Sequence, residues 1–129
     1  MPIEFEISAI IIAPVENLYR AWLDSELHTK MTGGKAEVSD QVGGSFTAWD
    51  GYISGKNLEL DAGKRILQTW RTTEFADSES DSKIEIWFEK IDGGTKVTLK
   101  HTDLPPHGTQ YEQGWEEAYF QPMREYFTK

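Results

Sequence analysis

The segment from Gly108 to Phe127 constrains the fold of this chain more than any other part of the sequence. At the ~100° step per residue of an α-helix, its apolar and aromatic side chains span an arc of roughly 200°. Polar side chains fill the opposite side. The segment is therefore predicted to be an amphipathic helix that lies across a large apolar surface. The apolar arc comprises Tyr111, Trp115, Ala118, Tyr119, Phe120, Pro122, Met123, Tyr126 and Phe127.

Length and composition exclude several classes of function. The 129 residues suit a single domain over residues 1–129, which can bury a core without disulfides or metals. The chain contains no cysteine, so thiol nucleophiles and zinc–thiolate sites are excluded. A formal net charge of −9 repels phosphate backbones and anionic lipids, so we expect neither nucleic acid nor a membrane as a partner. No signal peptide or membrane-spanning run is evident, which favours a cytoplasmic protein.

The N-terminal quarter of the chain shows one strand followed by two short helices. Residues 3–12 alternate apolar and polar side chains, which is the period of a strand. Pro14 suits the first turn of a helix, and apolar residues then recur at helical spacing up to Trp22. Asp24 or Ser25 can cap a second short helix. These elements precede the part of the chain that is rich in strands.

Short alternating runs separated by glycine-containing turns fill the chain from Lys35 to Thr102. The clearest of them is Lys83 to Lys90, and Thr95 to Thr102 follows it after a tight turn. These runs read as antiparallel hairpins. The predicted fold class is therefore α+β, with a curved antiparallel sheet of about six to seven strands. Two short helices and the long C-terminal helix pack across that sheet.

Several short motifs follow one another in order along nearly the whole chain. They are Pro14-Val15-Glu16-Asn17-Leu18-Tyr19, Gly43-Gly44-Ser45-Phe46, Asp50-Gly51, Ser54-Gly55, Lys64-Arg65-Ile66 with Trp70-Arg71, Leu104-Pro105, and Gly114-Trp115 with Tyr119-Phe120. This ordered set resembles the C-terminal domain of the activators of the Hsp90 ATPase. That domain belongs to the START-like, or Bet v 1-like, helix-grip superfamily. The resemblance implies a helix-grip fold, in which a curved sheet holds a long terminal helix.

The same resemblance implies two kinds of partner. Members of the wider superfamily hold sterols, lipids, plant hormones or polyketides under the long helix, so a small hydrophobic or aromatic ligand is the first expectation. An Hsp90-type chaperone is the second expectation. It ranks after the ligand because family members with co-chaperone activity carry an additional N-terminal domain with its own chaperone contacts. An enzyme of the cyclase or hydrolase type ranks third.

The aromatic side chains of the C-terminal helix either fill the space above the sheet or line a pocket there. His101 shares a predicted strand face with Leu99, and Gln68 shares one with Ile66, so both polar side chains are expected to point at the helix. Each is either a satisfied core group or a hydrogen-bond partner for a ligand. The candidate cavity residues are Gln68, Trp70, His101, Trp115, Tyr119, Met123 and Tyr126.

Two further tryptophans, Trp49 and Trp87, are expected on the face of the sheet opposite the apolar strand residues. A patch around Trp87 with Glu85 and Glu89 at its rim can dock a protein. The rings can equally pack across strands on Thr and Lys side chains. Trp49 and Trp87 are therefore the candidate residues for a protein interaction.

Catalytic and metal-binding patterns are poorly supported by the sequence. The three histidines His28, His101 and His107 lie on different predicted elements without the spacing of a metal site. Of these, His101 is the candidate acid or base of an enzyme, but no oriented partner is evident. We therefore predict no catalytic residue, no cofactor and no metal.

Overall fold

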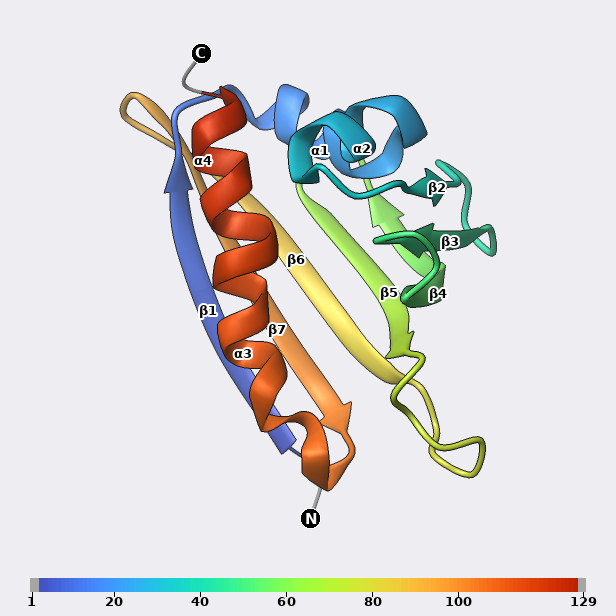
Figure 1. Ribbon diagram of the computed structural model, residues 1–129. Helices are drawn as coiled ribbons and strands as arrows, with labels where there is room; N and C mark the ends of the chain where they lie inside the picture. The colour runs from blue at the N-terminus through green and yellow to red at the C-terminus, as the bar shows by residue number, and fades with distance from the viewer. Residues whose placement is uncertain (1–2, 128–129) are drawn as a thin grey trace.

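One curved antiparallel sheet and a long helix in its hollow make up most of the molecule, and two short helices close one end (Figure 1). The computed structural model describes residues 3–127. The predicted α+β fold class is confirmed. The strands are β1 (Ile3–Ile11), β2 (Glu37–Val38), β3 (Ser45–Ala48), β4 (Ile53–Asp61), β5 (Arg65–Thr72), β6 (Ser82–Ile91) and β7 (Gly94–Leu104). The helical elements are α1 (Val15–Leu23), α2 (Ser25–Thr32), η1 (Pro106–Thr109), α3 (Gln110–Trp115), η2 (Glu116–Phe120) and α4 (Gln121–Phe127).

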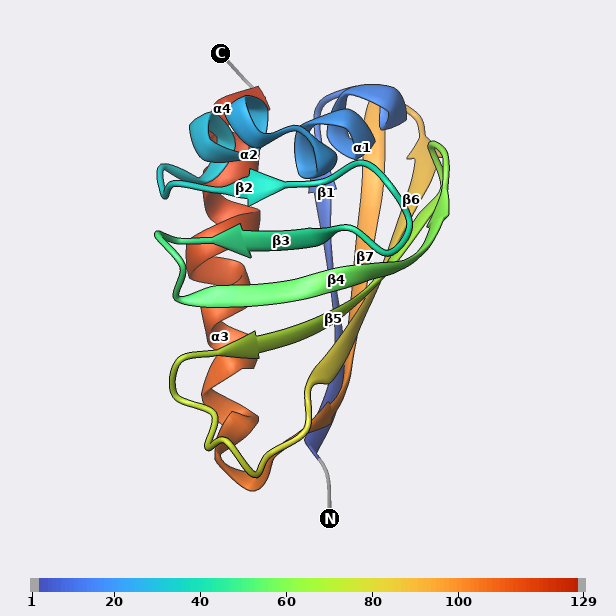
Figure 2. The ribbon, with the colours of Figure 1, turned by 90° about the vertical axis from the view of Figure 1, so that its right-hand side faces the viewer.

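The sheet has the strand order β1-β7-β6-β5-β4-β3-β2, and all neighbouring strands are antiparallel. Figure 2 shows how the sheet bends, so that β3 to β5 cross in front of the C-terminal helix. A register shift between Asn57 and Glu59 in β4 marks an irregularity of the kind that bends a strand. Gly55 lies nearby, and a Cβ there would come within 1.9 Å of the Thr69 carbonyl oxygen. Only glycine allows this close approach of β4 to β5.

Helices α1 and α2 begin and end where local chemistry dictates. Pro14 precedes α1 and leaves no backbone N–H to satisfy at that position. Trp22 is buried on the apolar side of α1. The Asp24 carboxylate accepts a hydrogen bond from the Leu27 N–H at 2.9 Å and so caps α2, as predicted. Gly33 ends α2 with φ of 88°, a left-handed conformation that favours glycine.

The C-terminal helical segment changes its geometry along its length. It runs from the 3-10 turn η1 through α3, the π-helical turn η2 and α4. In η2 the Gln121 N–H donates to the Glu116 carbonyl, five residues back. Pro122 lies inside this helical segment and removes a backbone hydrogen bond there, and the π turn ends two residues before it. Tyr119 and Phe120 are consecutive in the chain, yet both are buried under the helix.

The alternation predicted for the central strands is confirmed by burial. Ile84, Ile86 and Phe88 of β6 are buried, as are Val97 and Leu99 of β7. These side chains form one core with the inner side of the C-terminal helix. Within residues 3–127, no helix has the length and apolar character needed to cross a membrane.

Candidate functional site

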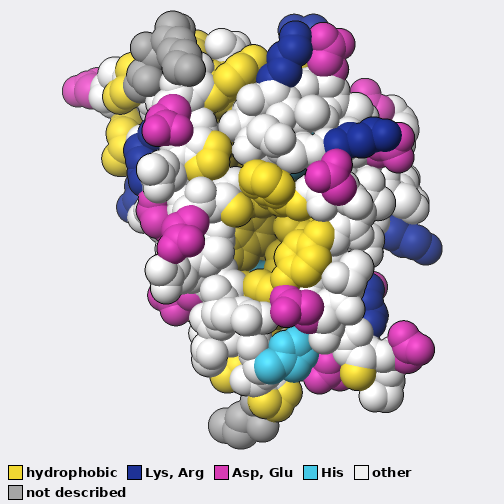
Figure 3. Space-filling model, in the orientation of Figure 1, with side chains coloured by type: hydrophobic (Ala, Val, Ile, Leu, Met, Phe, Trp, Pro, Cys, Tyr) yellow, Lys and Arg dark blue, Asp and Glu magenta, His cyan; other side chains and the backbone are white. Residues whose placement is uncertain are grey.

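A pocket of about 410 Å³ opens between the C-terminal helix and the β3–β5 side of the sheet. Figure 3 shows it as a hollow with hydrophobic side chains at its rim and inside it. Pockets for small ligands occupy roughly 300–1,000 Å³, so this volume lies within that range. The aromatic side chains of the helix thus line a pocket as well as filling the core. The lining residues are Trp49, Tyr52, Ile53, Trp70, Tyr111, Gly114, Trp115, Ala118 and Tyr119.

Gly114 shows that the space beside α3 is open. A Cβ built on Gly114 would have no heavy atom within 4 Å outside its own helix backbone and chain neighbours. Its backbone needs no positive φ, so glycine is not required there for conformational reasons. The absence of a side chain at this position therefore contributes directly to the volume of the pocket.

His101 supports the pocket wall through hydrogen bonds that fix its tautomer. The Trp115 Nε1–H donates to His101 Nδ1 at 3.0 Å, so Nδ1 carries no proton. His101 Nε2–H then donates to Ser82 Oγ at 2.8 Å, and the Ser82 hydroxyl donates to the Trp70 carbonyl at 2.8 Å. Burial lowers the pKa of His101 to about 3. The ring is thus neutral at pH 7, and neither nitrogen is free for the acid or base role considered above.

A second buried histidine, His28, fixes Tyr119 in the same way. His28 Nδ1–H donates to the Trp22 carbonyl at 2.9 Å, which leaves Nε2 to accept from the Tyr119 hydroxyl at 3.0 Å. Burial lowers the pKa of His28, although the bond to the Trp22 carbonyl acts in the opposite direction. Burial also raises the pKa of Tyr119. This pair joins α2 to the π turn η2 and sets the position of one pocket ring.

The side-chain amides of Gln68 and Asn57 form a chain of hydrogen bonds that supports the pocket rings from the sheet. The Trp22 Nε1–H donates to Gln68 Oε1 at 3.3 Å, and Gln68 Nε2 donates to Asn57 Oδ1 at 2.8 Å. Asn57 Nδ2 in turn donates to the Ser39 carbonyl at 2.7 Å. Because both ends of the Gln68 amide are engaged, Gln68 is a satisfied core group that supports the stacked rings of Trp22 and Trp115.

The wall of the pocket carries no formal charge, since its lining residues within the described chain include no Asp, Glu, Lys, Arg or His. Tyr52 lies at the rim, and its hydroxyl donates to the Glu74 carboxylate. Burial and this bond raise the pKa of Tyr52. Tyr111 shares a 2.7 Å hydrogen bond with Thr72. Over residues 3–127 we find no cluster of His, Asp and Glu with the arrangement of a metal site.

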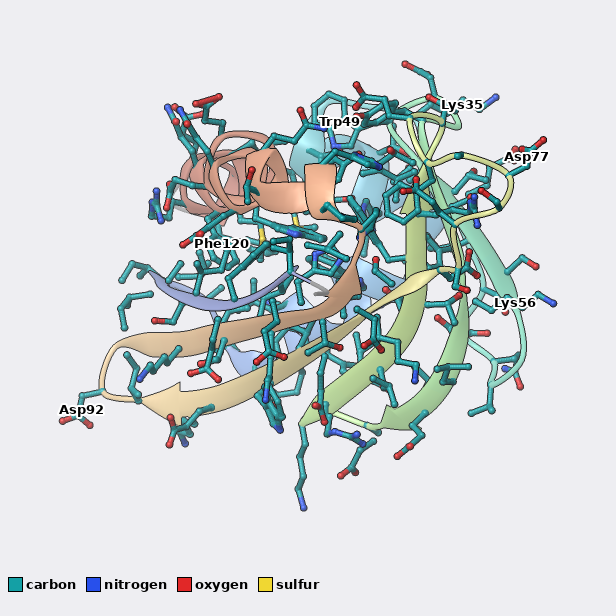
Figure 4. The ribbon with its side chains drawn as sticks, turned by 90° about the horizontal axis from the view of Figure 1, so that it is seen from below. Lys35, Trp49, Lys56, Asp77, Asp92 and Phe120 are labelled. Carbon is teal, nitrogen blue, oxygen red and sulfur yellow. The ribbon has the colours of Figure 1, made fainter. Side chains whose placement is uncertain are left out.

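The expected position of Trp49 on the outer face of the sheet is wrong. Strand β3 ends at Ala48, and Trp49 and Asp50 take φ of 52° and 61°. These left-handed residues reverse the chain and end the alternation of the strand, so the indole turns into the pocket wall. Figure 4 shows Trp49 beside the C-terminal helix, whereas Phe120 lies beneath the helix.

The other predicted residues occupy three kinds of position. Trp70, Trp115 and Tyr119 line the pocket. His101 binds the wall residue Trp115 from behind, and Gln68 binds Trp22, whose ring stacks on Trp115. Met123 is buried further along α4, and Tyr126 packs edge-on against Phe127 at 5.0 Å between ring centroids. Trp87 is half-buried on the outer face, where it pairs across strands with Arg65 and Thr98.

Sequence reasoning missed several residues of the site. Tyr111 and Ala118 lie on the predicted apolar arc and could have been added from the helical pattern alone. Tyr52 and Ile53 follow a turn whose direction the pattern of the sequence does not indicate. His28 gave no signal, because its partner Tyr119 is 91 positions away in the chain.

Comparison with known proteins agrees with this architecture. Residues 12–128 match the family described as "Activator of Hsp90 ATPase homolog 1-like protein". The chain belongs to this family. The suspected resemblance is thus confirmed, and the match spans strands β2 to β7 and the C-terminal helix.

The curated relatives of this chain are longer than the chain itself. The chain is 28% identical over 113 residues to activator of 90 kDa heat shock protein ATPase homolog 1 from Homo sapiens, covering 87% of this chain and 33% of that protein. It thus spans about a third of the length of the curated relatives it matches.

Two solved structures show the same fold over their whole length. One is an HSP90 activator from Plasmodium falciparum, with a TM-score of 0.88, 24% identity, and coverage of 97% of this chain and 96% of that chain. The other is a protein from Chromobacterium violaceum, with a TM-score of 0.79, 23% identity, and coverage of 98% and 97%. At these identities the likeness shows the fold alone.

Proposed function

We propose that this chain binds a small apolar, aromatic molecule in the pocket between its sheet and its C-terminal helix. The observation that carries the proposal is an open pocket of about 410 Å³ whose rings are held from behind by buried hydrogen bonds. Rings held in this way lose little conformational freedom when a ligand binds, which favours binding. An uncharged, aromatic wall suits an apolar ligand that stacks against it.

The test of this proposal is to fill the pocket from Gly114. Gly114→Phe is expected to weaken the binding of naphthalene, a two-ring apolar probe, at least about tenfold, because the new ring occupies the space that the probe needs. Gly114→Ala is the matched control. It is expected to keep binding and to stabilise the helix by about 0.5–1 kcal/mol. Affinity is measured by amide shifts in NMR titrations, and stability by urea unfolding.

Two outcomes would count against ligand binding at this site. One is an unchanged affinity of Gly114→Phe for naphthalene, with the variant shown to be folded by its amide spectrum. The other is a native protein whose pocket amides do not respond to naphthalene at its solubility limit. Either result would leave the pocket as an unfilled space without a ligand.

A second proposed function is an interaction with an Hsp90-type chaperone, which the family match favours. The surface we propose for it surrounds Trp87 on the outer face of the sheet, away from the pocket. Large aromatic side chains are enriched among the residues that dominate protein interfaces. The outer face and the pocket lie on opposite sides of the sheet, so the two functions can be tested separately.

For the chaperone, Trp87→Ala is expected to weaken binding to the host's Hsp90 homologue about tenfold. Gly114→Phe is expected to leave this binding unchanged, because it alters only the pocket. Binding is measured by calorimetry and ATP turnover by phosphate release. If the native protein neither binds the chaperone nor changes its ATP turnover, this second function is removed.

A further inference from the structure

Trp49 differs from Trp115 and Tyr119, two other rings of the pocket wall, in the state of its polar atom. Trp115 donates to His101, and the Tyr119 hydroxyl to His28. Across residues 3–127, Trp49 Nε1 is the buried side-chain nitrogen or oxygen that has no hydrogen-bond partner. Buried N–H groups are nearly always paired in folded proteins, so an unpaired one requires an explanation. Here the unpaired donor belongs to a residue that lines the pocket.

The backbone and the packing around Trp49 fix the position of its indole. A positive φ is rare for a bulky residue, and φ of 52° at Trp49 is followed by 61° at Asp50. The turn is held by hydrogen bonds from the Asp50 N–H to the Lys35 carbonyl at 2.9 Å and from the Tyr52 N–H to the Trp49 carbonyl at 3.1 Å. The structure thus maintains an unfavourable conformation that sets this ring in the wall.

Gly34 shows which edge of the indole packs against this glycine. A Cβ at Gly34 would come within 2.4 Å of Trp49 Cε3 and 2.9 Å of Cζ3. These atoms belong to the six-membered ring, on the edge of the indole away from Nε1. Gly34 therefore packs against one edge of the Trp49 indole. The opposite edge, which carries the N–H, has no contact with this glycine.

We propose that the pocket recognises an uncharged aromatic molecule with a hydrogen-bond acceptor at its edge, which accepts the Trp49 Nε1–H. This inference rests on the proposed function and adds the chemical class of the ligand. The apolar wall provides the stacking surface, and the Trp49 N–H provides the orientation. An ionised ligand is disfavoured, because no lining side chain within the described residues can pair with its charge.

The test compares three probes of similar shape: naphthalene, quinoline and 1-naphthoate. Quinoline carries a ring nitrogen that accepts a hydrogen bond, naphthalene lacks one, and 1-naphthoate is ionised at pH 7.5. Trp49→Phe keeps an aromatic ring but removes the N–H. The variant is expected to lose about fivefold to tenfold more affinity for quinoline than for naphthalene, the size of one net hydrogen bond. Comparing the two losses cancels the difference in hydration between the probes.

A second measurement uses the native protein alone. Quinoline is expected to move the indole Nε1–H resonance of Trp49 downfield, and naphthalene is not expected to do so. The loss of one indole signal in Trp49→Phe assigns that resonance. The Trp115 indole signal is the internal control, because its proton already binds His101. 1-Naphthoate is expected to bind at least about tenfold more weakly than quinoline.

The outcomes separate this inference from the function on which it rests. Two results would overturn the proposed hydrogen bond from Trp49 to the ligand, while ligand binding itself stands. They are equal losses of naphthalene and quinoline affinity in Trp49→Phe, and a Trp49 indole signal that quinoline does not move. Tighter binding of 1-naphthoate than of quinoline would overturn the inference that the ligand is uncharged. If neither neutral probe binds the native protein, both the proposed function and the inference fail.

Discussion

Replacing His101 with leucine is expected to lower the free energy of unfolding by about 2–4 kcal/mol. The substitution leaves the buried Trp115 N–H without an acceptor, and an unsatisfied buried donor accounts for about 1–3 kcal/mol of this loss. Imperfect repacking against Phe5 and Trp70, whose rings lie 5.5 and 4.6 Å from the imidazole, accounts for the rest. The native histidine thus stabilises the wall of the pocket without lining it.

The matched variant for this experiment is His101→Gln. A glutamine amide offers one acceptor for the Trp115 N–H and one donor for Ser82, so it is expected to recover part of the lost stability. Urea unfolding at pH 7.5 measures both variants, and His107→Leu on the surface is expected to change stability by less than about 0.5 kcal/mol. If leucine and glutamine prove equally destabilising, the hydrogen bonds do not carry the effect that we assign to them.

The fold could be predicted because its signals are local. The alternation of Ile84, Ile86 and Phe88 needs only eight neighbouring residues to be read, and the structure buries all three. The cap at Asp24 likewise follows from residues within one turn. The apolar arc of the C-terminal segment indicated a large surface beneath it, and the sheet supplies that surface. Patterns of this length determine which face of each element is buried.

The site was only partly predictable, because it depends on contacts between distant parts of the chain. Trp70, Trp115 and Tyr119 could be predicted, because the patterns of their strand and helix place them on the inward face. The partner of Tyr119, His28, lies in another helix, and no local pattern connects the two. Trp49 was misplaced because strand alternation was extended one residue too far, past the point where positive φ reverses the chain. Tertiary packing decides such turns, and a single sequence does not record it.

The stability of the protein is expected to fall steeply as the pH drops below about 6.5, by about 2–3 kcal/mol between pH 7 and pH 4.5 from His101 alone. The folded protein holds this histidine neutral with a pKa of about 3, whereas the unfolded chain takes up a proton near pH 6.5. The unfolded state therefore binds more protons between these two values, and acid favours it. The stabilisation is complete above pH 6.5 and is lost progressively down to the folded pKa of about 3.

Two other described groups act in the same direction, so a variant is needed to isolate His101. Burial lowers the pKa of His28, and backbone and His107 hydrogen bonds lower the pKa of Glu79. Urea unfolding at steps between pH 7 and pH 4.5 is expected to give a slope that is smaller in His101→Gln by about 1 kcal/mol per pH unit on average. Protonation of Nδ1 would place its new N–H against the Trp115 N–H, which is itself only a donor. Identical slopes in the two proteins would show that His101 is protonated in the fold, and would contradict the neutral tautomer that positions Trp115.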